Sequence, residues 1–137
     1  MKTLKVTAIL TVLASPVLAD DVEDGAEAFD RQCSSCHMIK DGDETLAGRG
    51  RNAPNLYGIA GRAPGTDDFR NYGDSLVAAG QTGIVWDEEQ FVVYVQDPTD
   101  WLRATTGDNR ARSKMGYKVR NDEDAEALWA YLATFGG

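Results

Sequence analysis

Residues 33–37 read Cys33-Ser34-Ser35-Cys36-His37, and this short stretch decides the fold that the whole sequence predicts. Its C-x-x-C-H spacing is that of c-type haem attachment. Two thiols three positions apart at the end of a helix can both add to the vinyl groups of one haem. The adjacent imidazole then lies under the iron as an axial ligand. We therefore expect one covalently attached haem c, bound through Cys33 and Cys36, with His37 on the iron.

Three other interpretations compete for the same residues: a plain disulfide, a thioredoxin-like redox pair and part of a zinc site. The sequence has 2 Cys and 1 His, so a zinc ion would lack a fourth ligand of the usual type. A thioredoxin-like pair is expected near a β-α-β pattern, which the sequence does not show. A structural disulfide leaves the adjacent His37 unexplained.

The second axial ligand follows by elimination. His37 and both thiols are used, Met38 adjoins His37 on the same side of the ring, and Met1 belongs to a leader described below. Met115 remains, and Gly116 permits a tight backbone beside it. The alternative is an ordinary loop or core methionine, with an iron that is five-coordinate or binds a lysine. Ligation by His and Met raises the reduction potential and fills the coordination sphere, as an electron carrier requires.

The composition limits what else the chain can be. Its 137 residues suffice for one domain. With 42% apolar and 26% charged residues, it has the composition of a globular protein. A formal net charge of −8 argues against nucleic-acid binding, which needs a basic surface.

Residues 1–19 have the pattern of a signal peptide. Lys2 and Lys5 precede the apolar run 6–13, and Val17 and Ala19 are small residues suited to a cleavage site. The run is too short to span a bilayer, which needs about 20 residues. An N-terminal core helix is the alternative. We expect cleavage after Ala19, a single domain over 20–137, and a soluble periplasmic protein with no stable membrane insertion.

The remaining sequence predicts an all-α fold of helices and long loops, without strands. Helices are expected over 22–33, 73–80, 87–97 and 99–104, and a last one begins after Asn121. Asp87 is the expected N-cap of the third helix with Gln90 as its return partner, Pro98 ends that helix, and Gly136 can end the last one. Residues 40–70 form a long loop, which is sensible if loops wrap a large flat apolar group.

Further motifs accompany the attachment site in a fixed order. They are Gly25 and Phe29, Pro54-Asn55-Leu56-Tyr57-Gly58, Gly61-Arg62, Tyr72, Trp86, Tyr94, Asp97-Pro98, Ser113-Lys114-Met115, and Leu128 with Tyr131. Together they resemble the class I c-type cytochromes, of the bacterial cytochrome c2 kind related to mitochondrial cytochrome c. The resemblance covers nearly all of the chain after residue 19. It implies a small single-domain cytochrome c fold around one haem.

The resemblance also implies roles for side chains around the haem. The carbonyl of Pro54 would accept the other N–H of His37 and fix its orientation. Haem propionates would be held by Arg62, Tyr72 and Trp86. Plain core packing is the alternative for each aromatic residue.

Other roles implied by the resemblance concern the far side of the haem and the helix crossing. Tyr94 would hydrogen-bond near the Met115 sulfur. Gly25 and Phe29 would let the first helix cross the last one closely. Leu76 stands where the family often has a polar Asn, which puts the buried water network there in doubt.

Basic residues cluster around Met115 although the chain is acidic. Residues 103–120 hold six basic residues and one acidic residue. An ordinary solvated face is one interpretation. The other is a ring that steers redox proteins to the haem edge, with binding that weakens as salt is added. That docking ring would comprise Arg110, Arg112, Lys114, Lys118 and Arg120.

These expectations favour a monomeric, non-enzymatic carrier that moves one electron between redox complexes. The resemblance suggests a bc1-type donor, and an oxidase, a photosynthetic reaction centre or a denitrification enzyme as acceptor. The first alternative is a haem peroxidase or gas-sensing cytochrome with a displaceable Met115. The second is a cytochrome subunit held permanently in a larger complex.

Overall fold

The computed structural model describes residues 19–136, and this range contains five α-helices and one two-stranded sheet. The elements, in chain order, are α1 (Ala19–Gln32), β1 (Met38–Asp41), β2 (Glu44–Gly48), α2 (Asp74–Gly80), α3 (Glu88–Gln96), α4 (Pro98–Thr106) and α5 (Asp122–Leu132). The expected signal peptide lies outside the described residues, apart from Ala19. No described helix is long and apolar enough to cross a membrane.

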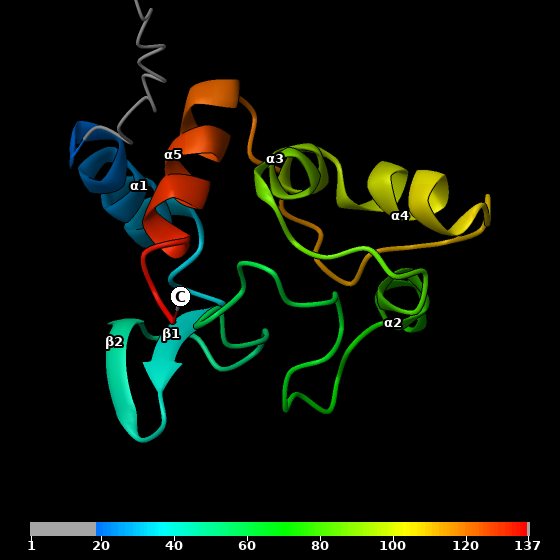
Figure 1. The fold of residues 1–137 in the computed structure, drawn as a ribbon, viewed down its shortest axis with the longest axis horizontal. Coiled ribbons are helices and arrows are strands. Elements are labelled where there is room, and N and C mark those ends of the chain that lie inside the picture. Colours follow the sequence, from blue (N-terminus) through cyan, green and yellow to red (C-terminus); the bar gives the residue numbers. More distant parts are fainter. Residues whose placement is uncertain (1–18, 137) are drawn as a thin grey trace, which may run out of the picture.

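Helices and loops surround the middle of the molecule (Figure 1). The first and last helices, α1 and α5, lie against each other on one side, and α3 with α4 continues from them along the same edge. The β1–β2 hairpin and α2 lie on the opposite edge, where the long segment between them also runs. Segments from both ends and from the centre of the sequence therefore meet around one interior.

Short-range signals place the helix ends close to where the sequence predicts them. The Asp87 carboxylate caps α3 by accepting from the Gln90 backbone N–H at 2.9 Å. Asn121 caps α5 through the Asp124 N–H at 2.7 Å. Pro98 follows α3 and begins α4, where its missing N–H is not needed.

Two details of the predicted caps are wrong. The Gln90 side chain does not return to Asp87, because its Oε1 accepts from Trp101 Nε1 of α4 at 2.9 Å. The last helix ends at Leu132 with Ala133 as its C-cap, so Gly136 lies beyond it. At Gln90 a contact between two helices replaced the local one.

The prediction of no strands is also wrong, although the fold is helix-dominated as expected. β1 and β2 pair antiparallel from Met38↔Gly48 to Asp41↔Glu44, with an irregularity after Ile39. Gly42 has a φ of 57° in the two-residue connection, a conformation that glycine adopts freely. Because Ile39 is the only buried residue in either strand, the hairpin shows none of the apolar alternation that identifies a strand in sequence.

The core is built on the close crossing of α1 and α5. A Cβ at Gly25 would overlap the Ala127 carbonyl oxygen and lie 2.6 Å from Tyr131 Cβ. Phe29 is buried beside this crossing, with its ring 5.8 Å from that of Tyr131. The predicted close approach of the first and last helices at Gly25 is therefore confirmed.

Candidate cofactor site

A cavity of about 480 Å³ lies at the centre of the fold. Its walls come from the end of α1, the segment 52–73, α3 and the segment 112–117. All predicted haem contacts line it: Cys33, Cys36, His37, Pro54, Arg62, Tyr72, Trp86, Tyr94 and Met115. The fold thus brings together residues that lie up to 82 positions apart, from Cys33 to Met115.

The attachment residues continue from α1 in a tight turn. The N–H groups of Cys36 and His37 both donate to the Cys33 carbonyl, at 3.1 and 2.8 Å. The two thiols are free, so they form no disulfide. Burial, with a smaller contribution from Cys36, raises the pKa of Cys33 to about 12. Cys33 is therefore a neutral thiol, unlike the thiolates of redox-active cysteine pairs.

Gly50 lies directly against this turn, a contact that sequence reasoning missed. A Cβ at Gly50 would overlap the Cys36 main chain. Its N–H donates to the Ser34 carbonyl at 3.0 Å. The glycine-rich composition of residues 42–50 was the available signal, but it did not say which glycine touches the turn.

The imidazole of His37 is fixed in one tautomer. Its Nδ1 lies 2.7 Å from the Pro54 carbonyl oxygen, which can only accept, so Nδ1 carries the proton and Nε2 keeps its lone pair. Burial lowers the pKa of His37, partly offset by this hydrogen bond. A neutral imidazole with an available nitrogen is the form that binds metals.

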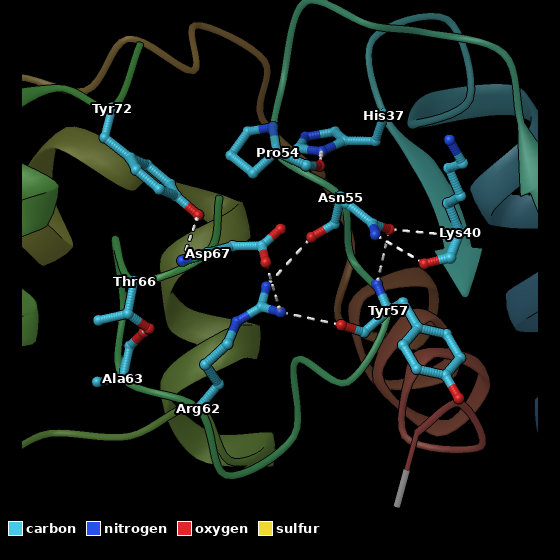
Figure 2. A network of polar contacts seen from close by, with 10 residues as sticks. All are labelled: His37, Lys40, Pro54, Asn55, Tyr57, Arg62, Ala63, Thr66, Asp67 and Tyr72. Carbon is cyan, nitrogen blue, oxygen red and sulfur yellow. Dashed lines mark hydrogen bonds and ion pairs between the residues drawn. The ribbon is translucent and has the colours of Figure 1, made fainter. Parts of the chain in front are cut away.

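Asn55 holds the Pro54 carbonyl in place and was also missed as a site residue (Figure 2). Its Oδ1 accepts from the Lys40 N–H at 2.9 Å and the Tyr57 N–H at 3.1 Å. Its Nδ2 donates to the Lys40 carbonyl at 2.8 Å. Asn55 therefore ties β1 to the segment that bears Pro54.

Arg62 lines the cavity, but its hydrogen bonds go to backbone carbonyls of nearby residues (Figure 2). It donates to the Tyr57 carbonyl at 2.9 Å and to the Asn55 carbonyl at 3.1 Å. Its Nη1 also lies 3.9 Å from Asp67 Oδ1. The nearby Tyr72 hydroxyl accepts from the Asp67 N–H at 3.2 Å.

Trp86 and Tyr94 line another wall of the cavity, and both rings pack against Trp101. Trp86 stacks on Trp101 at a centroid distance of 5.0 Å and lies 4.9 Å from Tyr94. Burial raises the pKa of Tyr94, and a hydrogen bond with Ser113 acts in the opposite direction. Tyr94 thus contacts the segment that carries Met115.

Hydrogen bonds anchor the Met115 segment to three other elements. The Arg112 N–H donates to Ser75 Oγ of α2 at 3.1 Å. The Ser113 N–H donates to Thr99 Oγ1 of α4 at 3.1 Å. The Tyr117 hydroxyl donates to Gln32 Oε1 of α1 at 3.0 Å. These bonds hold Met115 at the cavity wall.

The role expected of Gly116, a tight backbone beside the Met115 ligand, stays a prediction. A Cβ there would meet no described atom within 4 Å. Protein packing therefore does not require glycine beside Met115. Leu76 lines the cavity, so an apolar side chain occupies that part of the wall.

Basic side chains of the predicted docking ring are exposed, but they differ in position. Arg112 and Lys114 line the cavity, and Lys114 Nζ donates to the Asn71 carbonyl at 3.0 Å. Lys118 forms an ion pair with Asp97 at 2.9 Å. Arg110, Lys118 and Arg120 do not line the cavity.

These walls suit a large, flat, mainly apolar group with polar substituents. Packed protein interiors contain few voids larger than a water molecule, whereas ligand cavities measure about 300–1,000 Å³. Two thiols, an oriented imidazole and a thioether face the same space as Arg62 and Tyr72. This donor set fits a haem c. Among residues 19–136, no group of three His, Cys, Asp or Glu side chains could hold a metal ion alone.

Comparison with known proteins gives one consistent result. The family model described as Cytochrome c matches residues 22–136. The chain is 50% identical to cytochrome c-551 of Roseobacter denitrificans over 99% of this chain and 96% of that one. It is 49% identical to cytochrome c2 of Cereibacter sphaeroides over 91% of this chain and 89% of that one.

A solved structure of cytochrome c2 from Rhodobacter sphaeroides superposes with a TM-score of 0.81 at 48% identity. The superposition covers 84% of this chain and 95% of that one.

Proposed function

The chain belongs to the cytochrome c family, and on that premise we propose that it carries single electrons between redox proteins on one covalently attached haem c. The observation that carries this conclusion is the shared cavity of Cys33, Cys36, His37 and Met115. Similar proteins are cytochromes c2, c-550 and c-551. A peroxidase or gas-sensing function is not supported.

Each residue of the cavity contributes a defined part. Cys33 and Cys36 would form the thioether links, and His37 Nε2 and the Met115 sulfur would bind the haem iron. The bound haem supplies a one-electron iron couple. Pro54 orients the imidazole, burial favours its neutral form, and the anchored segment 112–117 keeps the thioether at the wall. A neutral thioether favours the reduced iron and therefore a high reduction potential.

Polar residues at the cavity would serve the haem propionates. Arg62, Tyr72 and Trp86 line the cavity on the side of the segment 52–73 and α3. Tyr94, with Ser113, would order the main chain beside the Met115 sulfur. Carboxylates in such a site need donors, because an unpaired buried charge is strongly unfavourable.

Visible absorption spectra of the purified protein, oxidised and reduced, test the ligand assignment. We expect a low-spin spectrum, a thioether-to-ferric-iron band and no response to carbon monoxide. Met115→Ala should abolish the band. Met38→Ala is the matched control, since Met38 adjoins His37 and should leave the band intact. A high-spin spectrum or ready carbon monoxide binding by the native protein would contradict the assignment.

The finer partner assignment rests on the exposed basic residues around the cavity. Arg112 and Lys114 would face an acidic site on the partner, with Arg110, Lys118 and Arg120 further out. We further propose that the protein works in the periplasm. It would accept electrons from a bc1-type donor and pass them to an oxidase, a photosynthetic reaction centre or a denitrification enzyme. Small transient interfaces are typical of such redox encounters.

The sign of a salt effect tests this docking surface without a known partner. Oxidation by hexacyanoferrate(III), an anion, should slow as salt is added if the local basic residues steer it. The net charge of −8 by itself predicts the opposite, because it repels the anion. Lys114→Gln should weaken the salt effect, and Lys40→Gln, outside the cavity lining, is the control. Oxidation that accelerates with salt would refute the docking assignment.

A further inference from the structure

Asp67 contacts Arg62 and Tyr72, two of the polar residues that line the cavity from the segment 62–72. Its carboxylate lies 3.9 Å from Arg62 Nη1, and its backbone N–H donates to the Tyr72 hydroxyl at 3.2 Å. Figure 2 shows Asp67 between these two residues. Asp67 itself does not line the cavity. Asp67 therefore contacts Arg62 and Tyr72 from the side away from the cavity lining.

The charge of Arg62 has one acidic neighbour in the described part of the chain. Its two hydrogen bonds go to neutral carbonyls, which orient the guanidinium without cancelling its charge. Asp67 forms the ion pair. Both side chains are largely shielded, with 22% of Arg62 and 28% of Asp67 exposed. A charge in this position is screened less than one on the open surface.

We propose that Asp67 is a positioning residue that lowers the reduction potential of this cytochrome by offsetting the charge of Arg62. This inference rests on the proposed placement of Arg62 beside the haem. Oxidation adds one positive charge inside the cavity, and Arg62 opposes that change. Asp67 partly cancels the charge of Arg62, weakens its repulsion of the added positive charge, and so favours the oxidised form. The electrostatic sign follows from Coulomb's law.

The direct test is a spectroscopic redox titration of Asp67→Asn. The substitution removes the charge but keeps the size of the side chain and the backbone bond to Tyr72. We expect the ratio of oxidised to reduced protein at a fixed applied potential to fall about two- to fivefold, since both partners are partly screened. A threefold change corresponds to about 28 mV for one electron.

The adjacent residue provides a matched control. Asp68 is exposed and has the same charge, and no ion pair or hydrogen bond of its side chain is found in the described structure. Asp68→Asn should shift the ratio by less than half as much on the logarithmic scale. Equal shifts in the two variants, or no shift in Asp67→Asn, would overturn the inference. Asp67→Ser repeats the test with a shorter neutral side chain if the first variant folds poorly.

A second variant separates this inference from the proposed function. Arg62→Gln should shift the potential in the opposite direction, favouring the oxidised form. If Arg62→Gln shifts the potential and Asp67→Asn does not, the role of Asp67 is refuted while the placement of Arg62 stands. If neither variant shifts it, the placement of Arg62 beside the haem fails as well.

Discussion

Replacement of Gly25 by alanine sets two effects of opposite sign against each other. Within a helix, alanine is favoured over glycine by about 1 kcal/mol, because glycine has more conformational freedom to lose. At the α1–α5 crossing, however, the added methyl group would overlap the Ala127 carbonyl oxygen and lie 2.6 Å from Tyr131 Cβ. Neither of these atoms is the end of a flexible side chain, so the helices must move apart.

The steric effect should win. Extra methylene groups in a well-packed core cost about 1–3 kcal/mol, and this position requires a backbone shift. Separation of the helices also disturbs the contacts of Phe29 and Leu128, which are 2% and 0% exposed. Because a backbone shift is required, we take the upper end of this range, about 3 kcal/mol, and subtract the gain of about 1 kcal/mol in helix propensity. We therefore expect Gly25→Ala to lower the free energy of unfolding by about 2 kcal/mol.

Guanidinium unfolding of the holoprotein, followed by tryptophan fluorescence, measures this change. Glu23→Ala and Glu23→Gly, at an exposed position of α1, calibrate helix propensity in the same helix. The glycine variant of that pair should be the less stable one, the reverse of the order at position 25. A Gly25→Ala protein as stable as the parent would refute the close crossing.

Three further changes test other contacts. Asn121→Ala removes the cap of α5 and should cost about 1 kcal/mol in denaturant unfolding. Trp101→Phe removes the hydrogen bond to Gln90 and part of the ring stack, and should cost about 1–2 kcal/mol in the same assay. The hydrogen bond from Lys118 holds the pKa of Asp97 below its usual 3.8, so the pair stabilises the fold above that pH. Asp97→Asn should therefore be less stable near neutral pH, and the difference should vanish as pH falls through the lowered pKa; a difference that persists in strong acid would contradict this.

Local patterns in the sequence were sufficient for much of the fold. The spacing of Cys33, Cys36 and His37 indicated the attachment turn, and Asp87 and Asn121 marked the starts of two helices. These signals act within three or four residues, so they can be read without knowing the rest of the structure. The close crossing at Gly25 was implied by the family resemblance.

Contacts between distant segments could not be predicted in the same way. The hairpin buries only Ile39, so its strands have no apolar pattern. The Gln90 side chain bonds Trp101 of the next helix instead of its own cap. Gly50 is required by the position of Cys36 and not by its own neighbours in sequence.

The sequence by itself determined the attachment chemistry, the starts of α3 and α5 and the family resemblance, because short-range geometry and residue type are sufficient for these. Only the tertiary structure decided what surrounds the cavity: which carbonyls Arg62 binds, that Asp67 lies behind it, and how the Met115 segment is anchored. Those contacts join residues whose separation along the chain carries no local signal. They form only when the folded core brings the segments within bonding distance.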